Sequence, residues 1–395
     1  MGIVVEHALG RTGKVFAAAQ TVIGTPVWIA ATDAMRFISC KLERSQNRKD
    51  REDKRQTRDR LTRFSGKISA KWELEKYISP SGTAGTAPDD DLLWTYLYGT
   101  ATNTPATSQA YSLAQPQTPS VFSLVLHHPD SILERGVGCI VDEATINLSG
   151  TGEARVKFSG PCRDVERAGG TITEDNGTSS GSAAISLTAN HGLRLFNGCR
   201  VQFLGASGRL TNSGAGYSVG SLGASAFTAG TVLEANTASP YSIWPFTPTE
   251  TVAGEPLDGI AGSSTIAGSA VTIMSAEISH KNNLSLIDDN YGSAYLDDAN
   301  LGKRDISGKL MLRASRDMVA YLIERGTSLG TAQFTTVPIV LVAGATAGSI
   351  LTLNYPYAEI QTANLQIPDE DEVTFELPFV VRGSAGEDSS TAVFT

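Results

Sequence analysis

The chain has 395 residues, 41% of them hydrophobic, which is enough for ordinary buried cores and fits two or three domains. Its formal net charge of −9 argues against a general nucleic-acid-binding protein, because neutralising phosphates requires a basic surface. The 39 glycines, together with abundant Ser, Thr and Ala, predict many turns and short strands, and therefore a mainly β protein.

Targeting signals are absent from the pattern. The first residues lack the basic segment and apolar run of a signal peptide, and no apolar stretch approaches the ~20 residues of a membrane helix. The four cysteines are far apart and match neither metal-ligand spacing nor a dense disulfide framework. We therefore expect a soluble protein that is made in a reducing cytoplasm.

The N-terminal region predicts short strands and then a hairpin with a charged tip. Val15–Ala19 and Val27–Ala31 are apolar enough for short strands or for an arm that packs on a neighbour. Phe37–Leu42 alternates like a strand. Residues 43–63 hold nine Lys and Arg against five acids, with Leu61 as the one apolar residue. This tip is either a solvated mobile loop or a contact loop, and its mixed charges favour a protein partner over nucleic acid.

The next stretch, Phe64–Glu75, is the strongest strand signal of the chain. Apolar and polar residues alternate along it, so one face is expected to be buried and the other exposed to water. Asp89–Tyr98 predicts a short helix, because acids precede it and Gly99 can end it. Further strands are predicted at the segments Val121–His127, Cys139–Leu148 and Glu153–Cys162.

Residues 165–262 differ in composition from what precedes them. Short strand-like pieces alternate with Gly, Asn and Ser, and a Pro-rich segment at 240–262 follows. This spacing predicts a small inserted β-barrel or sandwich with a linker back to the main fold.

From Ala270 onwards the order of elements in the first part repeats. The strand Ile306–Arg313 shares Ser-Gly-Lys with Phe64–Glu75, a helix is predicted at 315–326, and strands follow at Val337–Val342 and Ile350–Tyr357. Gly152–Pro161 aligns with Asp369–Pro378, so that Phe158 falls on Phe375. We interpret this as a tandem duplication with an insertion, and predict domains at 1–164, 165–262 and 263–395.

No convincing catalytic, cofactor or metal site emerges. Gly-x-Ser-x-Gly occurs at 177–181 and 216–220, but neither copy precedes a helical pattern, as a nucleophile elbow requires. The His127-His128 pair reads as a strand end without further ligands, and the acid pairs at 288–289 and 297–298 lack calcium-loop spacing. We therefore predict that the chain is not an enzyme and binds no cofactor or metal.

A sheet with one apolar and one polar face has edges that need pairing, and several chains can close such sheets into a ring. The ordered set of strands, helix and closing hairpins resembles the tail tube proteins of long-tailed bacteriophages, over residues 35–165 and 270–395. The duplication resembles members that fuse two tube domains. The resemblance implies two tandem β-sandwich or half-barrel domains, each with one helix.

This resemblance also implies an assembly. Three subunits would form a pseudo-sixfold ring, and stacked rings would form a virion tail tube through which DNA passes without specific binding. The implied partners are further copies of the chain and the tail terminator, tape measure and distal tail proteins, with assembly in the bacterial cytoplasm and no membrane. The insertion resembles decorative modules on the outside of some tubes.

Two sets of residues become candidates. The tip takes the ring-stacking position by similarity, and the polar sides of the long strands are candidates for the lumen. The stacking candidates are Arg48, Lys49, Asp50, Arg51, Glu52, Asp53, Lys54 and Arg55. The lumen candidates are Lys67, Ser69, Lys71, Glu73, Lys309 and Arg313.

Two alternatives stay open. The chain is otherwise a structural protein of the tail tip, baseplate or capsid, or a tail-associated hydrolase of cell-wall glycans. A hydrolase requires two carboxylates across a cleft.

Overall fold

The computed structural model describes residues 12–52, 59, 62–114, 118–128, 132–169, 172–174, 184–186, 195–196, 199–205, 217–222, 226–229, 241–313, 336–361, 364–366 and 373–395. Within these ranges the fold is mainly β, as the composition predicted, and every strand pairing is antiparallel. The predicted helix near residue 90 is confirmed as α1 (Asp91–Tyr98), the one α-helix of the described residues.

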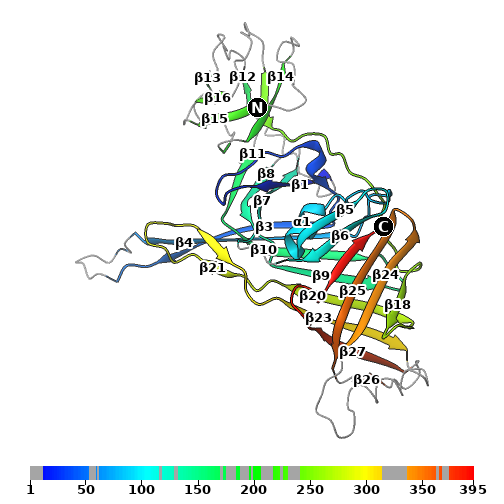
Figure 1. Cartoon of the computed structure of the whole chain (residues 1–395). Helices are drawn as coiled ribbons and strands as arrows, with labels where there is room; N and C mark the ends of the chain where they lie inside the picture. The colour runs from blue at the N-terminus through cyan, green and yellow to red at the C-terminus, as the bar shows by residue number, and fades with distance from the viewer. Residues whose placement is uncertain are drawn as a thin grey trace.

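The largest sheet runs through both halves of the chain (Figure 1). We call its middle part the central sheet, and its strand order is β3-β4-β10-β9-β20-β23-β27. The bounds are Ser39–Lys49 for β3, Phe64–Tyr77 for β4, Arg155–Cys162 for β10, Glu143–Ser149 for β9, Ile273–Lys281 for β20, Asp305–Arg313 for β23 and Thr374–Val381 for β27. The two halves meet where β9 pairs with β20 over seven residue pairs.

Further strands extend and cover the central sheet. Beyond β27 the order continues through β25 (Ser349–Ile360), β24 (Thr336–Thr346), β18 (Ser263–Ile266) and β19 (Ser269–Ala270). The short β26 (Asn364–Gln366) pairs with β27, and β28 (Thr391–Phe394) pairs with β25 and with β6. Because β6 (Ser108–Leu113) and its partner β5 (Gly99–Thr104) belong to the first half, the pairing of β28 with β6 also joins the two halves.

A separate five-stranded sheet lies in the first half. Its order is β11-β8-β7-β1-β2. The bounds are Asp164–Gly169, Ile132–Cys139, Val121–His128, Lys14–Gln20 and Ala34–Met35 in that order. The apolar segment at residues 15–19 is thus a strand, since β1 pairs with β7 along its whole length.

Six strand pairings of the first half recur in the second half. In the first half these are β1–β7, β3–β4, β4–β10, β9–β10, β7–β8 and β8–β11. In the second half the corresponding pairings, in the same chain order, are β18–β24, β20–β23, β23–β27, β26–β27, β24–β25 and β25–β28. The order of elements read from the sequence therefore corresponds to a recurring topology.

One hydrophobic core underlies both halves. Trp72, Trp94, Phe158 and Phe375 are all at most 1% exposed and belong to a single cluster. The rings of Trp94 and Phe158 meet edge to face at 5.6 Å between centroids, so α1 packs directly on the apolar side of the central sheet. Gly99 ends α1 at φ 106°, a left-handed conformation that favours glycine.

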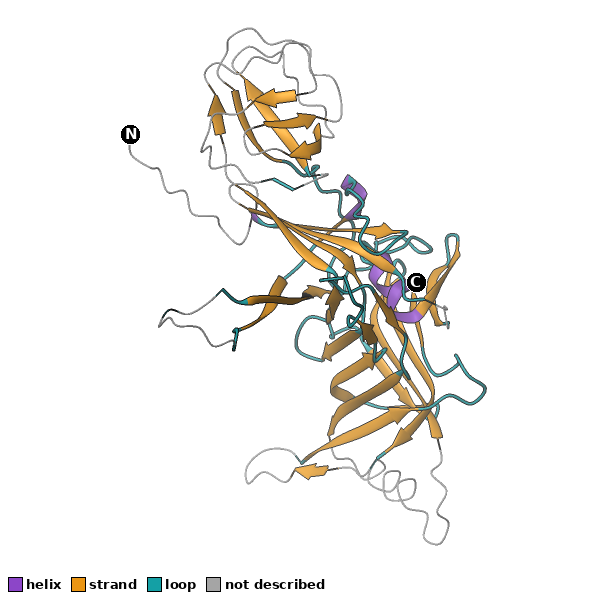
Figure 2. Cartoon of the chain, turned by 90° about the vertical axis from the view of Figure 1, so that its left-hand side faces the viewer, coloured by secondary structure: helices purple, strands orange, loops and turns teal. Residues whose placement is uncertain are grey.

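The region between the halves contains a six-stranded sheet with the order β12-β17-β14-β15-β16-β13 (Figure 2). The bounds are Ile172–Glu174, Tyr241–Pro245, Arg200–Gly205, Tyr217–Leu222, Ala226–Ala229 and Ala184–Ser186 in that order. The side chain of buried Arg135 on β8 donates to Glu166 at 2.8 and 2.5 Å, and its guanidinium lies 4.2 Å from the ring centroid of Phe196. This contact joins the base of the inserted region to the five-stranded sheet.

Two local predictions differ from the structure. Val27–Ala31, predicted as a short strand or a packing arm, is not a strand: residues 27–30 belong to no helix or strand, and Ala31 begins a short 3-10 helix. The single strand predicted at Cys139–Leu148 is in fact the end of β8 and the whole of β9, separated by residues 140–142. Most of β8 was missed because Glu134 and Arg135 interrupt its apolar pattern, although Arg135 is buried through its pairing with Glu166. The helix predicted at 315–326 lies outside the described residues.

Candidate functional site

The most distinctive surface of the molecule is the side of the central sheet opposite the core, which we call the polar face. Along β4 the buried positions alternate with Lys67, Ser69, Lys71, Glu73 and Glu75, which stand on this face. Cross-strand partners in antiparallel sheets share a face, so the register carries the polar face across the neighbouring strands. All six lumen candidates predicted from the sequence lie on this one face.

Ion pairs cover the polar face. The amine of Lys71 lies 2.9 Å from the carboxylate of Glu43, and Lys41 contacts the same carboxylate. Lys157 contacts Glu73 at 2.9 Å. The remaining pairs are Arg155–Glu75 at 3.6 Å, Lys281–Glu143 at 3.1 Å and Lys309–Glu277 at 2.9 Å. Glu43, Glu143 and Glu277 each occupy a polar position of an alternating strand, on β3, β9 and β20 respectively, a signal that the sequence analysis did not use.

Two of these ion pairs occupy equivalent positions. Lys71 stands opposite Pro161, and Lys309 stands opposite Pro378. Each lysine contacts the glutamate directly opposite it on the preceding strand, at 2.9 Å in both halves. The equivalent of Lys309 is therefore Lys71.

The shared Ser-Gly-Lys triplet implies a different correspondence, in which Lys67 matches Lys309. That correspondence is shifted by four residues from the register that aligns the two ion pairs and the two prolines. Burial supports the structural register, because Trp72 and Leu74 then match Leu310 and Leu312, and all four are fully buried. The triplets are a local coincidence within equivalent strands.

The other lumen candidates have individual environments. The amine of Lys67 donates to the backbone carbonyls of Asn290 and Ser293 at 2.8 and 2.5 Å, so a neighbouring loop occupies this side chain. Ser69 is exposed and stands opposite Ser45. Arg313 is exposed at the end of β23, opposite Thr374.

The charged tip between β3 and β4 begins later than the sequence indicated. Arg48 and Lys49 belong to β3, so the hairpin is longer than predicted. At its described base, Arg63 donates to Asp50 at 2.5 Å, and the guanidinium of Arg51 lies 5.6 Å from the ring centroid of Phe64. Glu52 is exposed. The candidates Asp53, Lys54 and Arg55 lie outside the described residues.

The loop between β20 and β23 leaves the central sheet at the same end as the charged tip (Figure 1). It contains a small hairpin of β21 (Ser285–Ile287) and β22 (Asp298–Asn300). The backbone N–H of Ile68 donates to the carbonyl of Ala294 at 2.8 Å, and the N–H of Leu284 donates to Asp142 at 3.0 Å. This second-half loop therefore packs on the first half.

Among the described strands, two edges of the central sheet have no partner strand. Within the same part of the chain, β3 pairs only with β4, and β26 pairs only with β27. In the recurring topology β3 corresponds to β20 and β26 corresponds to β9. Thus β9 and β20, which join the two halves by pairing with each other, correspond to β26 and β3, whose outer edges have no partner among the described strands.

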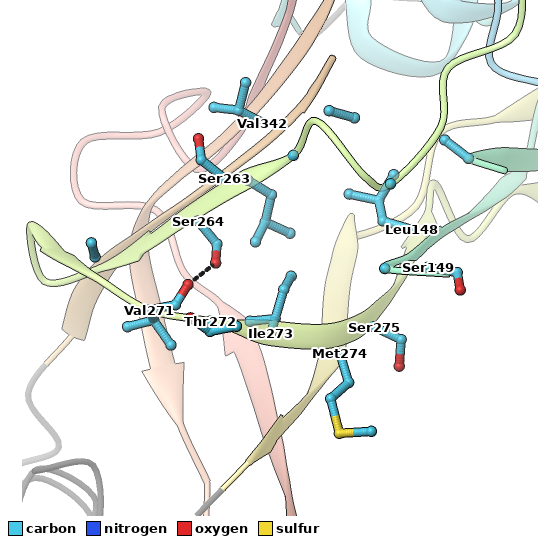
Figure 3. Close-up of a pocket in the computed structure, with 17 residues that line it drawn as sticks. Leu148, Ser149, Ser263, Ser264, Val271, Thr272, Ile273, Met274, Ser275 and Val342 are labelled. Carbon is cyan, nitrogen blue, oxygen red and sulfur yellow. Dashed lines mark hydrogen bonds between the residues drawn. The ribbon is translucent and has the colours of Figure 1, made fainter. Parts of the chain in front are cut away.

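An apolar pocket of about 320 Å³ lies where the end of β9 meets β18 and β20 (Figure 3). Leu148 and Ile273 line it from the two halves, with hydroxyls from Ser149, Ser264 and Thr272. No carboxylate, imidazole, thiol or amine is among its lining side chains within the described part of the chain. The pocket therefore provides neither of the two carboxylates that a glycan hydrolase needs.

Two of the described histidines, His127 and His280, are buried. The Nδ1 atom of His127 lies 2.7 Å from the Thr247 hydroxyl, and burial lowers the pKa of His127 to about 4. His280 is buried against the ring of Tyr98, and burial lowers its pKa to about 3. Both side chains are therefore neutral near pH 7.

Other chemistry is not assembled in the described ranges. Of the described residues, no three His, Cys, Asp or Glu side chains form a group that could hold a metal ion. Residues 217–220 of one Gly-x-Ser-x-Gly copy belong to β15, a strand, and the other copy lies outside the described residues. In the same part of the chain, no helix is long and apolar enough to span a membrane.

A β-rich chain with a polar sheet face, open sheet edges and long loops at one end has the features of a structural assembly protein. Residues 10–233, more than half of the chain, match a family model described as phage tail tube protein. The chain belongs to the phage tail tube protein family and is a structural component of the virion tail. Among curated proteins, none matches the chain.

Proposed function

We propose that three copies of this chain close into a ring with pseudo-sixfold symmetry, and that the rings stack into the tail tube. The observation that carries the proposal is the pairing of β9 with β20, which joins two similar four-stranded units inside one chain. The outer edge of β3 and that of β26 then pair between copies in the same manner. Such closure removes the open sheet edges, which otherwise favour uncontrolled association.

We call the pairing of β9 with β20 the internal seam. Its register predicts which residues of β26 and β3 stand opposite each other between copies. Thr145 on β9 stands opposite Ser279 on β20. Gln366 on β26 is equivalent to Thr145, because the two residues occupy the same place in their hairpins. Ser45 on β3 is equivalent to Ser279 on β20. The proposal therefore places Gln366 of one copy opposite Ser45 of the next.

In this ring the polar face lines the lumen, because the opposite side of the central sheet is buried under α1 and the outer strands. DNA passes along this face without sequence-specific contacts. The charged tip and the loop with β21 and β22 leave the sheet at one end, where they meet the next ring.

We further propose the division into two tube domains at 1–164 and 263–395 with an inserted module between them. The recurring pairings support the two tube domains, and the six-stranded sheet supports the module. By family resemblance, the tube ends contact the tail terminator, tape measure and distal tail proteins, and assembly occurs in the host cytoplasm. The proposed role is structural and does not involve catalysis.

Negative-stain electron microscopy and analytical ultracentrifugation of the purified protein test this function. The proposal expects rings or hollow tubes about a hundred ångströms wide, as a closed ring of six sheet units requires. The smallest closed species should have three times the mass of the chain. A stable monomer at all concentrations, or closed rings whose copy number is not three, would contradict the proposal.

A further inference from the structure

Five of the six lysines on the polar face contact a glutamate on the same face. These lysines are Lys41, Lys71, Lys157, Lys281 and Lys309. The other, Lys67, donates to backbone carbonyls of the neighbouring loop. A sixth cation, Arg155, lies 3.6 Å from Glu75.

Stability does not explain this arrangement. The lysine side chains of these pairs are 45–64% exposed, and ion pairs in such surroundings contribute roughly 0–1 kcal/mol each. The same pair nevertheless occupies the same register position in both halves, as Glu43–Lys71 and Glu277–Lys309. A recurring pair with little effect on folding indicates a role at the surface itself.

The net charge of the whole chain does not predict the charges on the polar face either. The net charge of −9 predicts an acidic lumen, whereas the polar face carries basic and acidic side chains side by side. Duplex DNA binds proteins largely through phosphate contacts that release condensed counterions. A lysine already held by a carboxylate must give up that contact before it binds a phosphate, so little free energy is gained.

We propose that this face avoids binding duplex DNA because its glutamates hold its lysines, and that an excess of acidic charge is not the cause. The proposal rests on the proposed function only for its biological setting, the lumen. Its prediction concerns the polar face of any copy of the chain.

The electrostatics of the best-placed glutamate agree with this role. Hydrogen bonds from Lys41 and Lys71 lower the pKa of the Glu43 carboxyl to about 2. The hydrogen bond from Lys157 likewise lowers the pKa of Glu73, and the bond to Glu277 raises the pKa of Lys309. These pKa shifts favour the charged forms of Glu43, Glu73 and Lys309, the forms that make the ion pairs.

The test removes the glutamates and keeps the lysines. The double variant Glu43→Gln with Glu277→Gln leaves Lys41, Lys71 and Lys309 without their carboxylates. A matched control, Glu255→Gln with Glu387→Gln, changes the net charge equally. Its two glutamates contact Arg36 and Arg304, away from the strands of the polar face.

Binding of a 30-base-pair fluorescent duplex to the unassembled protein is measured by anisotropy at 50 and 200 mM salt. The E43Q/E277Q variant is expected to bind at least ten-fold more tightly than the wild type at 50 mM salt. Three freed lysines that each contact a phosphate predict a loss of roughly forty-fold between the two salt concentrations. The control variant should bind no better than the wild type.

Adding Lys41→Gln, Lys71→Gln and Lys309→Gln to the variant should abolish the gained binding. Equal binding by the wild type and E43Q/E277Q, or an equal gain in the control, would overturn the proposal. Because the DNA meets unassembled protein, a polar face that does not line a lumen leaves these outcomes unchanged. A failure of the ring proposal is therefore distinguishable from a failure of the pairing proposal.

Discussion

Phe375 provides a direct measure of how the apolar side of the central sheet holds the second half together. Its side chain is 1% exposed, and on β27 it stands opposite Leu312 of β23 and Leu365 of β26. Replacing a buried phenylalanine by alanine removes its apolar contacts and leaves a cavity, which costs about 3–5 kcal/mol. We expect Phe375→Ala to destabilise the chain by this amount.

The thermal shift follows from the size of the chain. An unfolding entropy of about 2.1 cal/mol/K per residue makes 3–5 kcal/mol equivalent to roughly 4–6 °C in Tm for a chain of this length. Differential scanning calorimetry of the unassembled protein measures the shift. The control is Glu376→Ala, because Glu376 stands on the other face of the same strand and its loss should cost under about 0.5 kcal/mol. An unchanged Tm for Phe375→Ala, or equal shifts for the two variants, would refute the burial argument.

Two further predictions concern the tip and the pH dependence of stability. Replacing residues 51–62 by a short Gly-Ser linker should leave Tm nearly unchanged and block ring stacking in micrographs, since β3 ends at Lys49 and β4 begins at Phe64; normal tubes would contradict this. Burial lowers the folded-state pKa of His280 to about 3, so between that value and about 6.5 only the unfolded state binds its proton. As the pH decreases through this window, the free energy of unfolding should decrease by up to about 1.4 kcal/mol per pH unit. His280→Gln should flatten this dependence of the unfolding free energy on pH, measured by urea titrations at several pH values. Identical pH dependence in the variant and the wild type would show that His280 does not contribute.

Much of the fold was predictable because its strongest signals are local. The alternation of Phe64–Glu75 requires a strand with one buried face, and the structure has β4 there. The acids before α1 and the glycine after it define a helix in a chain of strands. The repeated order of elements corresponds to recurring strand pairings, which a single chain can reveal without relatives.

What the sequence did not reveal depends on contacts between distant residues. The pattern of β8 is hidden by Arg135, whose burial requires Glu166 on β11 and Phe196 in the inserted region. The register that makes Lys71 equivalent to Lys309 follows from cross-strand partners, and the shared triplet pointed four residues away. For the same reason Glu43, Glu143 and Glu277 were missed as residues of the polar face, because their role depends on lysines of neighbouring strands.

The central claim is that the seam between copies repeats the seam within the chain, and paired cysteines test it most directly. Thr145→Cys with Ser279→Cys spans the internal seam, whereas Ser45→Cys with Gln366→Cys spans the proposed external one. The native thiols interfere little, since Cys139, Cys162 and Cys199 are buried, and burial raises the pKa of Cys40 to about 12 and that of Cys199 to about 11.

After mild oxidation of assembled particles and denaturation, the mass of the cross-linked species is read by non-reducing electrophoresis and mass spectrometry. The T145C/S279C pair should form a disulfide within single chains. The S45C/Q366C pair should join chains into dimers and closed trimers, with no larger product. Monomers alone from S45C/Q366C, while T145C/S279C forms its disulfide, would contradict the account.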